Sequence, residues 1–122
     1  MKSILLVGIG GAIGSICRYL MQTGIGKIYT QAFPLGTFIV NITGCFIIGL
    51  LFGLATKQSW FTVEWRLLLV TGICGGYTTF SAYSYESINL LNQGNYLYFV
   101  LYAGLSVMLG FFATWCGVLL FK

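Results

Sequence analysis

The chain has 122 residues, of which 58% are hydrophobic and 7% are charged, and its mean hydropathy is +0.92. Soluble domains carry roughly 25% charged residues, so this composition excludes an ordinary soluble fold. The net charge of +4 does not indicate a nucleic-acid partner, because the six basic residues are scattered among apolar runs. We therefore expect an all-α membrane protein in which residues 1–122 form a single domain of four transmembrane helices.

The first predicted span covers residues 4–21, close to the length of about 20 residues that crosses a bilayer. We do not interpret it as a signal peptide, because it contains Arg18 and three further apolar segments follow it. Gly10 and Gly14 have the small-xxx-small spacing that allows two helix backbones to approach closely. Arg18 follows one turn later. It either extends to the membrane interface or places a positive charge at the mouth of an anion pathway.

A short polar link at residues 24–33 leads to Pro34, the single proline, which opens a second span at residues 35–55. Thr37 and Asn41 are one turn apart on this span and share a face. An asparagine at this depth needs hydrogen-bond partners. Its amide either joins two helices or donates a hydrogen bond to an anion, and the sequence leaves both interpretations open.

The third span, residues 67–91, follows a polar link at residues 56–64 and contains Gly-Gly-Tyr-Thr-Thr-Phe-Ser at residues 75–81. Paired glycines and β-branched threonines disfavour a continuous helix, so we predict a membrane helix that breaks and restarts here. Such breaks free carbonyl groups and helix ends, which bind ions at membrane depth. Phe80 and Tyr83 then share a face, and their electropositive ring edges either pack in the core or favour a small anion.

The fourth span covers residues 96–121 and follows an uncharged link at residues 92–95. Along this span every fourth residue is polar or small, and the row either packs between helices or lines a narrow polar track: Tyr98, Tyr102, Ser106, Gly110 and Thr114. On the third span, Glu86 lies one turn beyond Tyr83. It is either an acid at a helix end or part of a pore mouth.

The residue types argue against catalysis. The chain has no His and no Asp, and it offers no carboxylate pair and no nucleophile beside a base, so we do not expect an enzyme. The cysteines form no Cys-x-x-Cys pair, and we interpret them as small buried residues: Cys17, Cys45, Cys74 and Cys116. The spans do contain uncharged hydrogen-bond donors that suit a dehydrated anion, namely Asn41, Thr79, Ser81, Ser84, Tyr102 and Ser106.

The basic residues give a weak orientation signal. Four spans place both termini and the second link on one side of the membrane. Basic residues on that side outnumber those on the other by four to two: Lys2, Lys57, Arg66 and Lys122 against Arg18 and Lys27. This small positive-inside bias is compatible with insertion in either orientation.

These motifs resemble those of a known family. The sequence at residues 75–81 resembles the Gly-Gly-x-Thr-Thr-Phe-Ser signature of the CrcB/Fluc fluoride channels. Residues 10–19 resemble the family's first-helix pattern, and residues 36–44 resemble its second-helix pattern, with Asn41 at the position of the pore asparagine. The resemblance covers the whole chain. One departure is Tyr83, where the family usually has phenylalanine.

The resemblance implies a dual-topology dimer of antiparallel subunits with two pores, formed by two copies of this chain or by this chain and a paralogue. It implies passive, selective export of fluoride from the cytoplasm across the cell membrane, which would confer fluoride resistance. A structural Na⁺ ion, not itself transported, would lie at the dimer centre on the backbone carbonyls of Gly75 and Thr78. Arg18 would lie in the vestibule, and the pore residues would be Asn41, Thr79, Phe80, Ser81, Tyr83, Tyr102 and Ser106.

Two other functions can be weighed against a fluoride channel. A proton-coupled small multidrug exporter also has four helices, but it needs a carboxylate deep in the membrane to exchange protons for a cationic drug. The first span has no carboxylate, and Glu86 is the single candidate on the other spans. A purely structural membrane protein would give no reason for the threonine-rich break.

Overall fold

The structure, a computed structural model, describes residues 1–121, and the secondary structure in this part of the chain is helical. The elements in chain order are α1 (Lys2–Ile28), α2 (Leu35–Lys57), α3 (Val63–Arg66), η1 (Leu67–Cys74), α4 (Gly75–Tyr77), α5 (Phe80–Asn92) and α6 (Tyr96–Leu119). Helical dihedral angles at the junctions join α3, the π-helix η1 and α4 into one rod. The prediction of four crossings, with the third one broken, is therefore confirmed.

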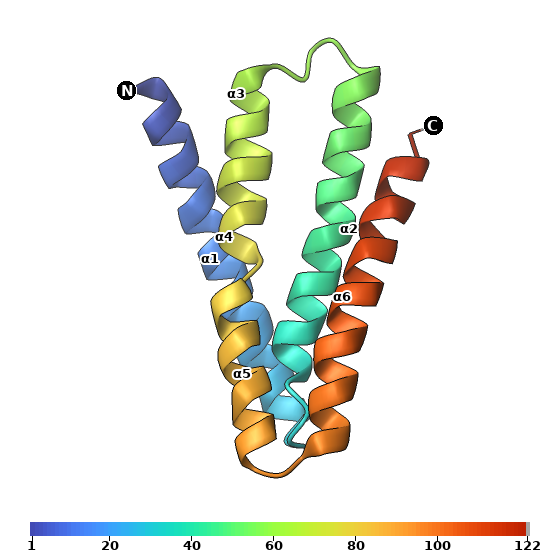
Figure 1. Cartoon of the computed structure of the whole chain (residues 1–122). Coiled ribbons are helices and arrows are strands. Elements are labelled where there is room, and N and C mark those ends of the chain that lie inside the picture. Colours follow the sequence, from blue (N-terminus) through green and yellow to red (C-terminus); the bar gives the residue numbers. More distant parts are fainter. Residues whose placement is uncertain (122) are drawn as a thin grey trace.

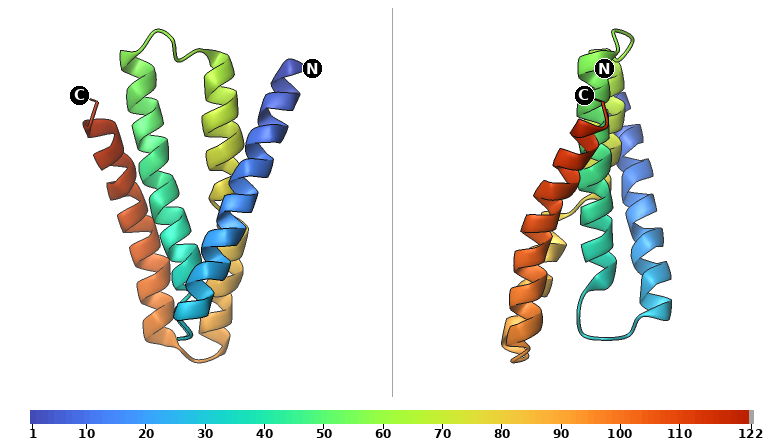
Figure 2. Two further views of the ribbon diagram at one scale, coloured as in Figure 1. Left: turned by 180° about the vertical axis from the view of Figure 1, so that it is seen from behind. Right: turned by 90° about the vertical axis from the view of Figure 1, so that its right-hand side faces the viewer.

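The helices form a V in which two pairs of neighbours diverge toward one end (Figure 1). α2 packs along α6 in one arm, and α1 packs along η1 and α4 in the other. Beyond the break, α5 continues beside α6. Both chain ends lie at the same end as the link from α2 to α3, as the views from behind and from the side also show (Figure 2). An even number of crossings requires this arrangement.

Most of the apolar surface faces outward. α1, α2 and α6 are each long and apolar enough to cross a membrane. Among residues 1–121, the largest fully buried side chains are Val40, Cys74 and Tyr102. In lipid, the exposed apolar side chains need no protein cover, because hydrocarbon is as apolar as they are.

The predicted end of the first span is wrong. α1 continues through residues 22–28, so the polar link is shorter than expected and leads directly into Pro34. Gly24 and Gly26 weaken a helix, but neither stops one, and a carbon added at either position meets no atom within 4 Å. The extended end is held against α2 because the Gln22 side chain donates a 3.0 Å hydrogen bond to the Thr37 hydroxyl.

Glycines set how closely α1 approaches the third crossing. A Cβ added to Gly10 would lie 2.8 Å from the Cα of Gly72, and one added to Gly76 would lie 2.6 Å from the Gly11 carbonyl oxygen. The small-xxx-small prediction for α1 is therefore confirmed. Gly75 and Gly76 keep a helical backbone, so the break itself falls at the threonines that follow, and Gly76 serves close packing against α1.

This packing predicts the effect of Gly76→Ala. The new methyl group would meet backbone atoms of α1, which cannot rotate away, so the helices must separate and the protein should lose about 1–3 kcal/mol of stability. Thermal unfolding in detergent measures the loss. The matched control is Gly24→Ala, where the space is open and the helix propensity of alanine should leave stability unchanged or raise it by up to about 1 kcal/mol. Equal stabilities for the two variants would contradict this account of the α1 contact.

Candidate functional site

The break in the third crossing consists of two extended residues. Thr78 has φ −81° and ψ 155°, and Thr79 has φ −147° and ψ 124°. Thr79 is also the N-cap of α5, because its hydroxyl oxygen accepts a 3.2 Å hydrogen bond from the Ala82 N–H. The threonines therefore interrupt one helix and start the next, as β-branched residues with short polar side chains do readily.

The break frees backbone carbonyls. In a continuous helix the Gly75 carbonyl would accept from the N–H of Thr79, but that N–H donates instead to Oδ1 of Asn41 at 2.9 Å. The Thr78 carbonyl would accept from the N–H of Ala82, which donates instead to the Thr79 hydroxyl. Both carbonyl oxygens thus lose the donors that a helix would supply, and oxygen atoms of this kind suit a hard cation.

Asn41 connects α2 to the break through its side-chain amide. Its Oδ1 accepts from the Thr79 N–H, and its Nδ2 donates to the Thr79 carbonyl, both at 2.9 Å. The helix-joining interpretation of Asn41 is therefore confirmed. An amide nitrogen carries two hydrogens, and these bonds use one of them, so a second donor is left on the same side chain.

Arg18 extends to the break from α1. Its Nε donates a 3.1 Å hydrogen bond to the carbonyl of Gly76, which in a continuous helix would accept from the N–H of Phe80. Arg18 is therefore in contact with the break. The half-buried guanidinium brings a permanent positive charge to the end of α4, where the helix dipole is negative.

A cavity of about 380 Å³ lies beside the break, between α2, α5 and α6. It brings together most of the predicted pore residues, since its walls include Asn41, Thr79, Phe80, Tyr83 and Ser106. The remaining lining is the break residue Thr78 with mainly apolar side chains: Cys45, Ile48, Val107 and Phe111. Few polar groups in a largely apolar wall are typical of a selective binding site.

The hydroxyl groups at this cavity differ in whether they already have a hydrogen-bond partner. The Thr78 hydroxyl donates to the Cys74 carbonyl at 2.9 Å, and the Thr79 hydroxyl is shared with Ser81 at 3.3 Å. Ser106 Oγ is buried and has no hydrogen-bond partner among residues 1–121. An unpaired buried hydroxyl costs free energy, so it is expected to find a partner in the cavity. Ser81 itself is exposed and lies outside the lining.

The aromatic side chains form a connected series. The ring centroids of Phe80 and Tyr83 are 5.8 Å apart, which confirms that they share a face, and those of Tyr83 and Tyr102 are 5.2 Å apart. The Tyr83 hydroxyl donates to the Ala103 carbonyl at 2.7 Å, so its hydrogen is already used within the protein. The Phe80 side chain is 78% exposed in a single chain.

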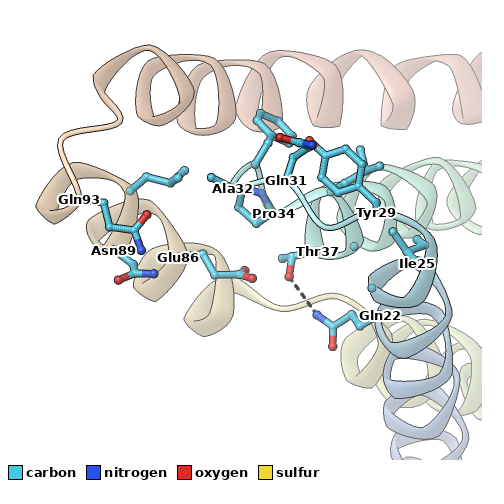
Figure 3. A pocket seen from close by; sticks show the side chains of 15 residues that line it. Gln22, Ile25, Tyr29, Gln31, Ala32, Pro34, Thr37, Glu86, Asn89 and Gln93 are labelled. Carbon is cyan, nitrogen blue, oxygen red and sulfur yellow. Dashed lines mark hydrogen bonds between the residues drawn. The ribbon is translucent and has the colours of Figure 1, made fainter.

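A second cavity of about 430 Å³ lies between the end of α1, the α1–α2 link and α5. Tyr102 is fully buried, and its hydroxyl donates to Oε1 of Glu86 at 3.3 Å. Figure 3 shows Glu86 in this second cavity with Asn89, Gln93 and the Gln22–Thr37 pair. Glu86 and Tyr102 therefore do not line the first cavity; Glu86 lines the second one, and Tyr102 is bonded to it.

Two further predictions concern the polar row on α6 and the cysteines. Thr114 donates to the Cys45 carbonyl at 3.1 Å, so this part of the α6 polar row joins two helices and does not line a cavity. The four cysteines are free thiols. Cys74 is buried as expected, but the expectation fails for Cys17, which is exposed on the outer face of α1. Outward-facing positions of a membrane helix accept any apolar side chain, so this one needs no protein cover.

Comparison with known proteins identifies the family of this chain. The family model described as "CrcB-like protein, Camphor Resistance (CrcB)" matches residues 5–118. That match contains the break, both cavities and every predicted site residue. The chain belongs to the CrcB family. As a CrcB protein it is a multi-pass membrane protein and not an enzyme, as the composition indicated.

Individual CrcB relatives are similar over their full length. The protein of Flavobacterium psychrophilum named "Fluoride-specific ion channel FluC" is 47% identical, with 100% of this chain and 98% of the relative covered. The relatives with the same name from Gloeothece citriformis and Leptospira interrogans are 48% and 42% identical. They cover 100% and 99% of this chain, and 98% and 95% of their own lengths.

The sequence did not reveal every contact of the CrcB site. The hydrogen bond from Arg18 to Gly76 joins positions that are 58 residues apart, and no local pattern indicates it. The unpaired state of Ser106 depends on which neighbours α5 and α6 bring to it. The sequence placed Ser106 in a polar row and among the candidate anion donors, but it did not show that this hydroxyl lacks a partner.

Proposed function

We propose that this chain forms a passive, fluoride-selective channel that exports fluoride from the cytoplasm and thereby confers fluoride resistance. The observation that carries the proposal is the cavity beside the break. Its lining combines the unpaired Ser106 hydroxyl, the side-chain amide of Asn41 and the rings of Phe80 and Tyr83. The names of the full-length CrcB relatives agree with this assignment.

The cavity suits a small anion for electrostatic reasons. An ion that leaves water at membrane depth needs hydrogen-bond donors in its place, and Ser106 and Asn41 each have one available. The electropositive edges of the Phe80 and Tyr83 rings add to this field without bringing a full charge that would trap the ion. Conduction requires binding that is strong enough for entry and weak enough for release, and neutral donors meet both conditions.

Na⁺ fits the break as a structural ion. The carbonyls of Gly75 and Thr78 are the two whose helical donors are bound elsewhere, and carbonyl oxygens are ligands that Na⁺ accepts. A cation held there would supply a fixed positive charge near the anion path. The residues around the break contribute no carboxylate to this site, so the ion would rest on backbone dipoles.

The proposed assembly is an antiparallel dimer, built from two copies of this chain or from this chain and a paralogue. Two features support it. Phe80 is largely exposed although it adjoins the cavity, so a second subunit would be needed to enclose that side. Two carbonyls also give Na⁺ fewer ligands than it prefers, and a symmetry-related pair from a partner would double their number.

The test of the function is ion flux from liposomes that contain the purified protein. Fluoride efflux should be rapid, and chloride efflux under the same gradient should be lower by orders of magnitude. A protein that passes chloride as readily as fluoride would refute the proposal. The multidrug-exporter alternative is disfavoured by the CrcB match over residues 5–118 and by the position of Glu86 in the second cavity, among polar side chains. It would require Glu86→Gln to abolish drug resistance in cells.

Tyr83→Phe tests what the unusual hydroxyl does. Because that hydroxyl already donates to the Ala103 carbonyl, fluoride efflux should stay within about threefold of the wild type. The variant should also lose roughly 1 kcal/mol of stability, the typical net contribution of one hydrogen bond. The control is Tyr98→Phe, which removes the hydroxyl of an α6 tyrosine that does not line the cavity. A tenfold or greater loss of efflux in Tyr83→Phe would instead place the hydroxyl in the fluoride path.

A further inference from the structure

Tyr77 anchors the end of α4 to α2 through a hydrogen bond that the proposed function does not use. The other two residues of α4 are glycines, so Tyr77 supplies the one side chain by which this turn is held. Its hydroxyl lies 2.9 Å from Oγ1 of Thr43. The Thr43 hydroxyl hydrogen is directed to the Ile39 carbonyl at 2.7 Å, so Tyr77 is the donor and Thr43 is the acceptor.

The surroundings of this hydrogen bond fit an anchoring role. A Cβ added to Gly44 would lie 3.2 Å from Cδ2 of Tyr77, so the absence of a side chain at Gly44 lets the tyrosine ring lie against α2. On the opposite side of α4, Arg18 donates to the Gly76 carbonyl. The turn is therefore held between α1 and α2 by one side-chain hydrogen bond on each side.

Tyr77 lies in the chain between the two residues whose carbonyls are freed by the break. Glycine backbones resist rotation weakly because they carry no side chain to pack. Without the Tyr77 anchor, a small rotation of α4 would redirect the Gly75 carbonyl. The Thr78 carbonyl is held separately, because it shares a peptide with the Thr79 N–H that donates to Asn41. Coordination of a cation by fixed carbonyls is sensitive to such shifts, because each ligand must point at the ion.

We propose that the Tyr77–Thr43 hydrogen bond is a positioning contact, which orients the Gly75 carbonyl for Na⁺. This inference rests on the Na⁺ site of the proposed function. It assigns a task to Tyr77, the variable position of the Gly-Gly-x-Thr-Thr-Phe-Ser motif, and to Thr43, which lies outside that motif.

The test is a double-mutant cycle read by Na⁺-dependent thermal unfolding. Tyr77→Phe and Thr43→Val each remove one partner with little change of shape. The purified protein is titrated with NaCl at constant ionic strength against N-methyl-D-glucamine chloride. Each single variant should need three to ten times more Na⁺ than the wild type for half of the maximal rise in unfolding temperature. The double variant should need no more than either single one, since both changes remove the same bond.

Two controls separate this contact from general damage. Thr43→Ser keeps the hydroxyl and should therefore keep the wild-type Na⁺ dependence. Thr114→Val removes a hydroxyl that bonds across α2 and α6 away from the break, and should leave the Na⁺ dependence unchanged. Fluoride efflux from liposomes prepared with and without Na⁺ gives a second reading of the same shift.

Three results would overturn the inference. Single variants with the wild-type Na⁺ dependence, or additive effects in the double variant, would exclude the contact while leaving the channel and its cation site intact. A wild-type protein whose unfolding temperature does not respond to Na⁺ would overturn both the contact and the cation site. Absence of fluoride efflux from wild-type liposomes would separately refute the channel.

Discussion

Replacement of Asn41 by aspartate is expected to reduce fluoride efflux by about 100-fold, which corresponds to ~2.7 kcal/mol on the permeation barrier. Aspartate has the same shape and keeps an oxygen for the Thr79 N–H. It removes both amide hydrogens, so the Thr79 carbonyl loses its donor and the cavity loses one of its two available donors. Its negative charge would also repel an anion at short range in a medium of low dielectric constant.

The measurement is fluoride efflux from liposomes that contain equal amounts of folded protein, verified by gel filtration. The matched control is Asn92→Asp, which makes the same change at the exposed end of α5, where only a small effect is expected. Efflux from Asn41→Asp close to the wild-type rate would show that the amide hydrogens serve only the break. The proposed anion-binding role of Asn41 would then be wrong.

Replacement of Phe80 by leucine is expected to lower fluoride efflux by tenfold or more with little loss of stability. Leucine keeps most of the apolar volume but has no electropositive ring edge to face an anion. Stability should change little, because Phe80 is 78% exposed in the single chain and makes few contacts that folding depends on. A large loss of flux from a stable protein would therefore identify a role for the ring in permeation.

Tyr85→Leu is the control for Phe80→Leu. Tyr85 lies on the same helix and is 72% exposed, but it does not line the cavity. Its replacement should leave fluoride efflux within twofold of the wild type. If both variants lose flux equally, the effect would come from general disturbance of α5. If neither loses flux, the ring edge of Phe80 has no part in anion recognition.

The architecture could be predicted from the sequence because the bilayer restricts the possible folds. Apolar runs near 20 residues can cross only as helices, so the count and order of the crossings followed directly. The break was predicted from the glycine pair and the two threonines, and it falls at the threonines, since both glycines stay helical. A close contact of α1 with another helix followed from the spacing of Gly10 and Gly14, although the spacing did not identify the third crossing as its partner. All of these are local signals, and each depends on only a few neighbouring residues.

Features that depend on tertiary contacts could not be predicted in this way. The π-helical geometry of η1 has no signature in its apolar sequence. The extension of α1 past residue 21 is supported by the bond between Gln22 and Thr37, which lie on different helices. The position of Arg18 at the break depends on the depth at which α1 packs against α4. In each case a contact between distant residues decides between local alternatives that the sequence leaves open.

The location of both chain ends at the same end of the bundle limits how two copies can be fused into one polypeptide (Figures 1 and 2). A short hydrophilic linker between the two copies would insert both of them in the same orientation in the membrane. Opposed halves in a single gene product would require an odd number of extra crossings between them, and one additional apolar helix is the smallest solution. Fluoride efflux can be compared for two fused dimers, one with and one without that additional helix. The fusion that conducts fluoride would show whether the two halves must insert parallel or antiparallel.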